Sequence, residues 1–201
     1  MTPARVVVFI DYQNLHASAL DCFWPRNTHP SQGHIDPIRL GRLIVAKRSA
    51  NAHPSRLVQV RVYRGRPSPH RQPAAAAAGD RQADAWSRSP LAVVKRRPLR
   101  YPRGWPAVPP QEKGIDVALA VDIVRMGIEG AFDVCALVSG DADLLPAIET
   151  IMELRCGHVE VAAWRGGGRL MLPGTSLPWC HWMDEADYRS VEDLTDYSKR
   201  P

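Results

Sequence analysis

The sequence predicts a doubly wound α/β fold, in which helices cover a central, mainly parallel sheet. Short β-branched and aromatic runs alternate along the chain with longer segments of helical character. Two of the runs, Val6–Ile10 and Val134–Val138, are apolar throughout, as strands buried on both faces of a parallel sheet are. An aspartate follows each of them closely, Asp11 in the first case and Asp141 in the second. The carboxyl ends of parallel strands form one crevice, so distant segments are expected to meet there.

The first part of the chain predicts a strand, an irregular stretch, a helix and a second strand. The first strand is Val6–Ile10, and residues 12–35 hold prolines and a glycine without a clear period. Asp36 followed by Pro37 is typical of a helix start, and the helix is expected to run to about Arg48. Leu57–Tyr63 alternates apolar and polar residues, as a strand does.

Residues 66–110 are interpreted as a basic, proline- and alanine-rich insertion or loop. Pro67–Gly79 contains three prolines and five consecutive alanines, which favours a flexible loop, with a frayed helix expected around Asp80–Ser87. Leu91–Val94 is a candidate short strand. The basic, proline-rich segment Lys95–Pro110 follows it.

The second half is more regular. Ile115–Met126 is apolar on nearly every side, which predicts a buried helix, and Val134–Val138 is the central strand. Leu144–Leu154 predicts a helix and His158–Trp164 a strand. The acidic tail, residues 184–201, is expected to be loosely held. Two short elements complete this half: Arg169–Leu172 and Cys180–Met183.

Composition favours one soluble domain over residues 1–201. A chain of 201 residues can bury one sizeable core, and no apolar stretch approaches the roughly 20 residues that span a bilayer. The N-terminus lacks a signal-peptide pattern. The cysteines are scattered, with no CxxC pair, so we expect a reduced, cytoplasmic protein: Cys22, Cys135, Cys156 and Cys180.

Positive charge is concentrated in one segment. Pro54–Trp105 holds twelve Lys or Arg and only two acids, a net +10, whereas the rest of the chain carries −5. This segment suits a polyanionic partner; a solvated surface or a basic loop is the alternative. Tyr101 and Trp105 alternate with arginines and could stack on bases or form a hydrophobic latch. The candidate nucleic-acid contacts are Lys95, Arg96, Arg97, Arg100 and Arg103.

Carboxylates are expected to gather in the crevice. Asp11 and Asp141 follow strands, and Asp116 stands at the head of a helix. Clustered carboxylates resist ionising together unless a cation compensates, so the pattern predicts a divalent metal and phosphate chemistry. A structural turn is the alternative for Asp11, and a helix N-cap is the alternative for Asp116 and for Asp143. Asp122 lies about 120° around the helix from Asp116, which favours a buried ion pair or hydrogen bond instead.

Three segments together carry a family resemblance: Phe9–Asn14 (FIDYQN), Glu112–Asp122 (EKGIDVALAVD) and Val138–Asp143 (VSGDAD). They resemble the signature blocks of the NYN domain family, in its LabA-like branch within the PIN-like nuclease superfamily. The resemblance spans about residues 4–165. It implies a PIN-like three-layer α/β sandwich and cleavage of single-stranded or structured RNA that depends on Mg²⁺ or Mn²⁺.

The resemblance also implies roles for individual residues. Asp11, Asp116 and Asp141 match the acidic metal positions, and Asp143 matches a further acid of the last block, also a candidate metal ligand. Asn14 matches the family's asparagine; it is expected to orient a water or a phosphate oxygen, or to cap a turn. The acid that many PIN-like nucleases carry near the middle of the chain has no obvious counterpart in the basic segment.

These observations predict a metal-dependent endoribonuclease. The alternative is a non-catalytic NYN-fold module that binds RNA or protein. The chain could also form a homodimer. A phosphatase or receiver-like α/β protein fits less well. The Asp11–Asn14 turn lacks the second acid and the hydroxyl of one such phosphatase class, and no lysine stands directly after the late strand, as a receiver requires.

Overall fold

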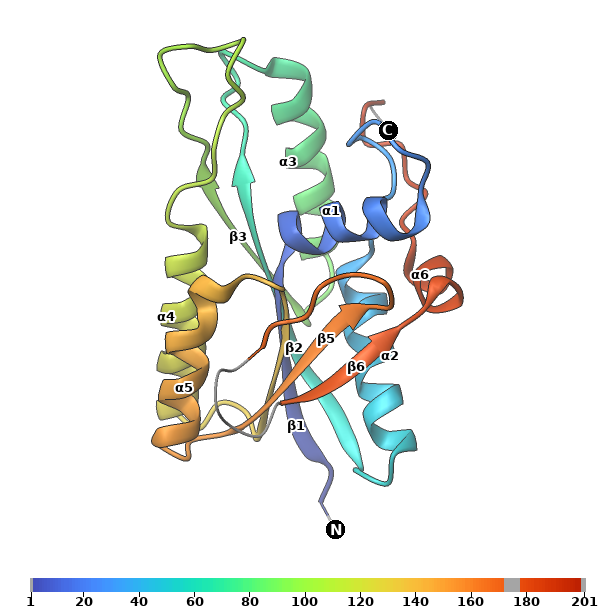
Figure 1. Cartoon of the computed structure of the whole chain (residues 1–201), viewed down its shortest axis with the longest axis vertical. Helices are drawn as coiled ribbons and strands as arrows, with labels where there is room; N and C mark the ends of the chain where they lie inside the picture. The colour runs from blue at the N-terminus through green and yellow to red at the C-terminus, as the bar shows by residue number, and fades with distance from the viewer. Residues whose placement is uncertain (1, 172–177, 200–201) are drawn as a thin grey trace.

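The structure, a computed structural model, describes residues 2–171 and 178–199 of the chain. Its centre is a six-stranded sheet in the order β3-β2-β1-β4-β5-β6, and every neighbouring pair is parallel (Figure 1). The α/β fold with a parallel sheet is therefore confirmed. The strands are β1 (Ala4–Asp11), β2 (Ser55–Arg66), β3 (Ala92–Pro98), β4 (Val134–Val138), β5 (His158–Trp164) and β6 (Trp179–Met183).

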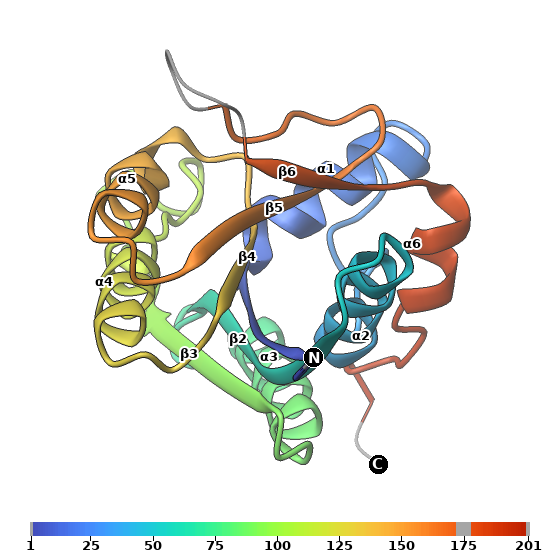
Figure 2. The same ribbon diagram turned by 90° about the horizontal axis from the view of Figure 1, so that it is seen from below.

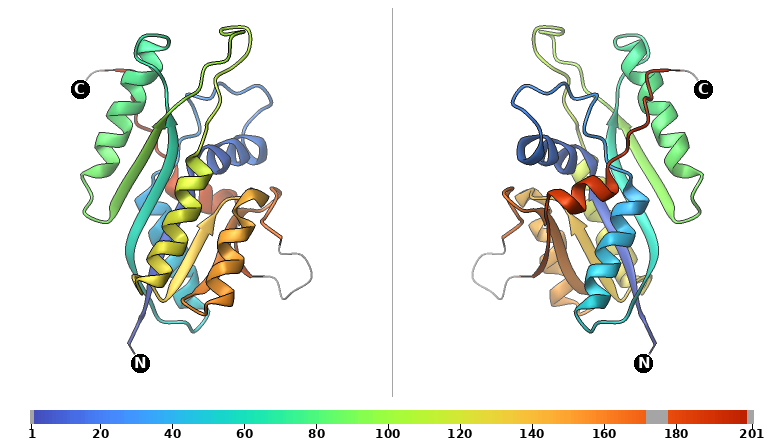
Figure 3. Two further views of the ribbon diagram at one scale, coloured as in Figure 1. Left: turned by 90° about the vertical axis from the view of Figure 1, so that its left-hand side faces the viewer. Right: turned by 90° about the vertical axis from the view of Figure 1, so that its right-hand side faces the viewer.

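Helices cover both faces of the sheet, which makes three layers, as in the PIN-like fold (Figure 2). Helices α4 and α5 pack on one face, and α1, α2 and α6 pack on the other (Figure 3). The helical segments are α1 (Tyr12–Phe23), α2 (Pro37–Ala50), α3 (Pro73–Ser87), α4 (Ile115–Ile128), the 3₁₀ turn Ala142–Leu144, α5 (Leu145–Glu153) and α6 (Glu185–Val191).

Strand β1 shows why the central runs are apolar throughout. Val6, Val8 and Ile10 join the core beneath α1 and α2. Val7 and Phe9 join the core beneath α4 and α5. All five are fully buried, and each such side chain contributes roughly 1.5–3 kcal/mol to stability. The sheet is therefore anchored on both faces at the strand that carries Asp11.

The strand order sets the place of the site. From β1 the chain proceeds to β2 and β3 on one side, then crosses to β4 on the other side. The order thus reverses between β1 and β4, and ligands of open α/β sheets bind at the carboxyl ends of strands at such a point. Asp11 ends β1, and Asp141 follows β4 by three residues.

The irregular stretch expected after β1 was a wrong prediction, because α1 begins there at Tyr12. Asp11 is its N-cap and accepts a hydrogen bond from the Asn14 backbone N–H. The buried residues Tyr12, Leu15 and Ala19 lie on one face of the helix. Asp11 thus has two roles, and its interpretation as a metal ligand concealed the helix start.

The basic insertion is more ordered than expected. The alanine run belongs to α3, a 15-residue helix with Pro73 at its start, and not to a flexible loop. Alanine is the strongest helix former, and Trp86 of α3 is buried in the core beside α1 and α2. Strand β3 also continues to Pro98, so Lys95–Arg97 are strand residues and not loop residues.

The C-terminal tail is not loosely held within the described residues. Asp184 and Asp187 form a capping box at the start of α6. Tyr188 and Val191 are buried in the core beneath α1 and α2. The Asp193 backbone N–H then donates to the His34 carbonyl at 2.7 Å. Packing of two apolar side chains overrides the acidic composition here.

The segment of α4 is apolar on nearly every side and was expected to be a buried helix, but the structure buries only one face of it. Ile115, Leu119 and Ile123 are buried, but Val117, Val121 and Ile128 are 64%, 57% and 64% exposed. These three exposed side chains form an apolar stripe on the outer face of α4. Among the described residues, no helix is long and apolar enough to cross a membrane.

Of the two short elements expected late in the chain, one is confirmed and the other is not. Cys180–Met183 falls within β6 and is confirmed. For the other, Arg169–Leu172, residues 169–171 are neither helix nor strand. Residue 172 lies outside the described residues.

Candidate metal centre

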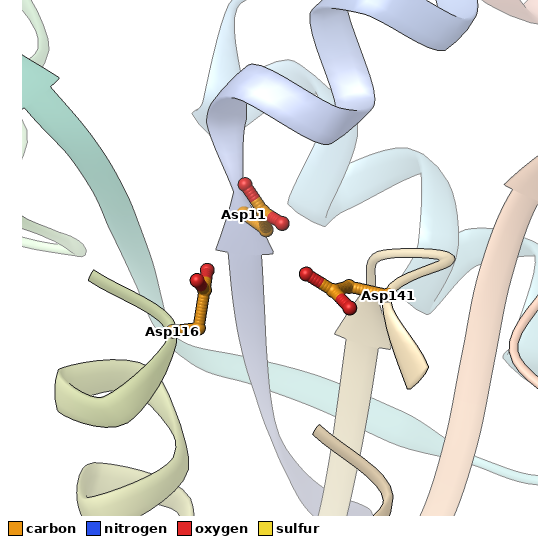
Figure 4. A group of neighbouring side chains, drawn as sticks. All are labelled: Asp11, Asp116 and Asp141. Atoms are coloured by element: carbon orange, nitrogen blue, oxygen red, sulfur yellow. The ribbon is translucent and has the colours of Figure 1, made fainter. Parts of the chain in front are cut away.

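Three aspartates meet at the carboxyl edge of the sheet (Figure 4). Asp11 ends β1, Asp141 follows β4, and Asp116 lies in the first turn of α4. One carboxylate oxygen from each lies within 4.8 Å of those of the other two. Asp11 is only 4% exposed, so the group is set into the protein. The meeting of distant strand ends that the sequence predicts is thus present.

Neutral donors hold Asp11 in place. One of its oxygens accepts from the Asn14 backbone N–H at 3.2 Å, and Oδ2 accepts from the Ser139 hydroxyl at 3.1 Å. The same Ser139 oxygen accepts from the Asp141 backbone N–H at 3.1 Å. Buried Ser139 therefore links two of the three aspartates. Sequence analysis gave Ser139 no role, although a small hydroxyl residue two positions before the site aspartate was the available signal.

Asn14 joins α1 to the turn that carries Asp141. Its side-chain oxygen accepts from the Gly140 backbone N–H at 3.0 Å. A Cβ atom at Gly140 would lie 3.4 Å from the Gly168 carbonyl oxygen, so three segments approach one another closely here. Asn14 thus fixes the relative position of Asp11 and Asp141.

Asp143 lies outside the group of three. It is exposed in the 3₁₀ turn Ala142–Leu144, and its backbone N–H donates to Asp141 Oδ1 at 3.0 Å. The N-cap of this turn is Asp141, and the N-cap of α4 is Gly114. The N-cap interpretations of Asp143 and Asp116 were therefore wrong, whereas the role of Asp143 as a metal ligand stays a prediction.

The three aspartates repel one another, and no cation of the described residues forms an ion pair with them. Burial raises the pKa of Asp11 from 3.8 to about 6, and the charges of Asp116 and Asp141 add to this effect. Burial also raises the pKa of Asp116, followed by the charges of Asp141 and Asp143. A bound cation would reverse both shifts.

Glu112 is a fourth acid that sequence analysis did not assign to the site. It lines the same cavity as Asp11, Asp116 and Asp141, and its Oε1 accepts from the Gly65 backbone N–H. Its pKa is raised to about 7, first by burial and then by the charges of Asp11 and Asp116. Glu112 lies outside the basic segment, in the NYN-like block itself, four residues before Asp116.

The donor set fits a hard divalent cation. All three side chains of the group offer carboxylate oxygens, which Mg²⁺, Mn²⁺ and Ca²⁺ prefer over nitrogen or sulfur. One oxygen of each carboxylate lies within 4.8 Å of those of the other two, so the three side chains face a common point. These aspartates could therefore hold a metal ion.

The five predicted nucleic-acid contacts do not form one surface. Alternate strand residues face opposite sides of a sheet. Accordingly, Lys95 Nζ lies 2.6 Å from Asp122 of α4, whereas Arg96 Nη1 lies 2.6 Å from Asp80 of α3. The remaining three are exposed and form no ion pair within the described part of the chain: Arg97, Arg100 and Arg103.

Two further interpretations can be compared with the structure. Asp122 is 4% exposed and pairs with Arg61 at 2.8 Å and with Lys95, so its assignment to a buried ion pair is confirmed. Tyr101 packs edge-on against Trp105 at 5.1 Å, and its hydroxyl donates to Gln72 Oε1 at 2.7 Å. These contacts favour the hydrophobic latch over free base-stacking platforms.

Comparisons with known proteins agree with this architecture. The family model of the NYN domain matches residues 5–167. A crystal structure of a protein of unknown function from Vibrio parahaemolyticus RIMD 2210633 is similar, with a TM-score of 0.50 and 17% identity over 80% of this chain and 81% of that chain. At that identity the likeness shows the fold alone. No curated protein matches the sequence significantly. Because the family match covers most of its length, this chain belongs to the NYN domain family.

Proposed function

We propose that the protein is a metal-dependent endoribonuclease that hydrolyses RNA phosphodiester bonds with Mg²⁺ or Mn²⁺. The observation that carries the proposal is the triad Asp11, Asp116 and Asp141, which is set into the carboxyl edge of an NYN domain and forms no ion pair with a cation of residues 2–171 or 178–199. A protein gains no stability from three carboxylates placed together. Their arrangement is useful when a divalent cation and a phosphate ester complete the site.

The residues of the site would have different roles in the reaction. A bound divalent cation would acidify a water molecule and offset the negative charge that develops on the leaving oxygen. The three aspartates would hold that cation, and Ser139 and Asn14 would keep two of them in position. Glu112 and Asp143, at the edge of the triad, would hold further waters and accept protons.

The exposed arginines of and after β3 would bind the RNA backbone. The guanidinium of Arg97 lies beside Gly114, the N-cap of α4, where a Cβ atom would be 3.6 Å from Nε. Arg97 is therefore close to the helix turn that carries Asp116. Together with Arg100 and Arg103 it gives phosphates a path toward the triad.

The alternative is a non-catalytic module that binds RNA or protein. The apolar stripe of Val117, Val121 and Ile128 favours a protein partner, because exposed apolar surface of this kind marks interaction sites. A second copy of the chain is one such partner. A module of this type would leave RNA intact in every metal.

The deciding experiment is cleavage of a panel of RNAs and single-stranded DNAs in Mg²⁺, in Mn²⁺ and in EDTA. We expect internal cleavage of RNA that requires the metal. Asp141→Asn should lower it at least about a hundredfold, since even residues that only orient metal ligands contribute 10–100-fold. Asp84→Asn, the same change on the exposed face of α3, is the matched control and should cleave normally. Cleavage by Asp141→Asn at the wild-type rate would refute the proposal.

A further inference from the structure

The cavity above the triad continues along α1. The aspartate cavity, of about 460 Å³, contains Asp11, Asp116 and Asp141. A second cavity of about 470 Å³, here called the α1 cavity, lies beside it, and the two share Asn14 and Ala17. The α1 cavity is lined by Asn14, Ala17, Ser18, Asp21 and Cys22 on one side and by Gly140 and Gly166–Gly168 on the other.

Glycines bring the far wall of the α1 cavity close to the helix. A Cβ atom at Gly167 would lie 2.6 Å from the Ser18 hydroxyl oxygen, so a side chain there would force Ser18 to move. Gly166 has a φ of +100°, a conformation that side chains rarely adopt. A Cβ atom at Gly168, by contrast, would meet nothing within 4 Å. The wall is therefore main chain, and Gly168 faces open space.

The polar groups of the α1 cavity suit hydrogen-bond donors more than phosphates. Asp21 is exposed, and its carboxylate can only accept hydrogen bonds. Ser18 adds a hydroxyl, and the glycine segment adds backbone groups. A phosphate beside Asp21 would be repelled, whereas the 2′-hydroxyl of a ribose would find an acceptor. The exposed Arg165, next to Gly166 in the chain, is available to a phosphate outside the cavity.

We propose that the α1 cavity binds the nucleotide next to the scissile phosphate, and that Ser18 and Asp21 recognise its ribose 2′-hydroxyl. This inference rests on the proposed nuclease function. A chain whose phosphate lies at the triad enters the α1 cavity past Asn14 and Ala17, which line both cavities. The cavity thus selects RNA over DNA by contacts that are separate from the metal ligands.

The first test fills the cavity without touching the aspartates. Gly168→Trp places a ring where the structure has open space, and Gly168 lines the α1 cavity but not the aspartate cavity. Gly79→Trp is the matched control, because a Cβ atom there also meets nothing within 4 Å and its φ is not positive. Two quantities are measured: the affinity for a fluorescent single-stranded RNA in EDTA, and the ratio of RNA cleavage to hydrolysis of bis(4-nitrophenyl) phosphate in Mn²⁺.

We expect Gly168→Trp to weaken RNA binding at least tenfold and to lower the RNA-to-diester ratio at least tenfold, with Gly79→Trp close to wild type. RNA binding and a ratio equal to those of Gly79→Trp would overturn the inference and leave the nuclease proposal intact. A wild type that hydrolyses neither RNA nor the diester would refute the nuclease proposal instead, and the binding measurement would still test the cavity.

The second test addresses the ribose. The affinities for an RNA and for a DNA of the same sequence are measured in EDTA with the wild-type protein. The same two affinities are then measured with the Asp21→Asn and Asp84→Asn proteins. We expect wild type and Asp84→Asn to prefer RNA, and Asp21→Asn to lose most of that preference through weaker RNA binding. An unchanged RNA-to-DNA ratio in Asp21→Asn would overturn recognition of the ribose by this carboxylate.

Discussion

Asp11 and Asp122 are equally buried, at 4% exposure each, but their surroundings differ in kind. Asp122 meets Arg61 and Lys95, and also accepts a hydrogen bond from the Tyr63 hydroxyl at 2.5 Å. Within the described part of the chain, the partners of Asp11 are neutral donors and two further carboxylates. The pKa of Asp11 is raised to about 6, mainly by burial. The pKa of Asp122 is held well below its usual range by its hydrogen bonds to Lys95, Tyr63 and Arg61, which outweigh burial.

Glu160 supports the same distinction. It is 3% exposed and accepts hydrogen bonds from Arg48 Nε at 2.8 Å, while His181 Nε2 lies 2.7 Å from its other oxygen. Like Asp122, it carries its partners within the fold. A buried carboxylate that is paired with basic side chains of the protein stabilises the fold. A buried carboxylate without such partners can instead bind a metal ion. The comparison therefore separates structural acids from site acids without reference to any motif.

The largest effect on stability is expected at Asp122. Asp122→Ala leaves Arg61 buried without its partner, and breaking a buried ion pair in this way costs about 3–5 kcal/mol. The exposed pair Arg5–Asp133 is the control, because Asp133→Ala should cost at most about 1 kcal/mol. Urea unfolding of both variants measures the difference. Equal losses would mean that burial does not distinguish the two pairs.

The opposite sign is expected at Asp11 in the metal-free protein. Its pKa is about 6 in the folded state against 3.8 normally, so folding is penalised by up to ~3 kcal/mol above pH 6. The penalty fades as the pH falls from about 6 to about 4. Asp11→Asn keeps the N-cap and removes the charge, so it should be more stable than wild type at pH 7 and similar near pH 4. Unfolding in EDTA across this range tests the sign.

Asp122 should show the reverse pH dependence. Its pKa is lowered by folding, so its stabilisation is present above the normal value near 3.8 and is lost as the pH falls further. The Asp122→Ala protein should therefore lose its disadvantage only in strong acid. An Asp11→Asn protein that is less stable than wild type at pH 7 and loses this disadvantage in acid, in the manner of Asp122→Ala, would contradict the distinction between the two acids.

Metal binding should stabilise wild type more than Asp11→Asn. A ligand that binds only the folded state contributes RT ln(1 + [L]/Kd), or about 2.7 kcal/mol at a hundredfold excess over Kd. Mn²⁺ in the millimolar range should therefore raise the Tm of wild type clearly, and that of Asp11→Asn much less. Asp84→Asn controls for nonspecific binding to surface carboxylates. Equal shifts in all three proteins would place the metal elsewhere.

The smallest effects concern the basic segment. Alanine at Arg97, Arg100 and Arg103 should weaken RNA binding and reduce the slope of log K against log salt by about 2, at about 0.7 for each phosphate contact. Lys95→Ala should leave that slope nearly unchanged and lower stability instead, because Lys95 is paired with Asp122. Binding at several salt concentrations distinguishes them. If Lys95→Ala changed the salt slope more than alanine at the three arginines does, Lys95 would be the phosphate contact and the arginines would not.

The sequence predicted the strand ends and therefore the meeting of Asp11 with Asp141. Local patterns suffice for this, because an apolar run and the residue after it define both the strand and its crevice. Glu112 was not predicted to belong to the site, because its position beside the triad depends on Gly65, 47 residues away in the chain. A Cβ atom at Gly65 would lie 2.8 Å from Glu112 Oε1, a contact that no local pattern reveals.

The errors over the helices and the basic residues also have physical causes. Helix α6 depends on Tyr188, whose hydroxyl accepts from Trp24 Nε1 at 2.7 Å across 164 residues of chain. Lys95 and Arg96 were expected in a loop, where neighbours can point the same way. In strand β3 the pleat sends them to opposite faces.

The contacts of α6 bear on where this protein can be shortened. The match to the NYN family ends at residue 167, before β6 and α6 begin. Yet the Asp36 backbone N–H donates to the Val191 carbonyl at 2.8 Å, which ties the end of α6 to the start of α2. A chain ending at residue 167 would also leave β5 as a bare edge strand, a template for aggregation. We therefore expect a piece that folds alone to be longer than the family signature and to extend at least through Asp193.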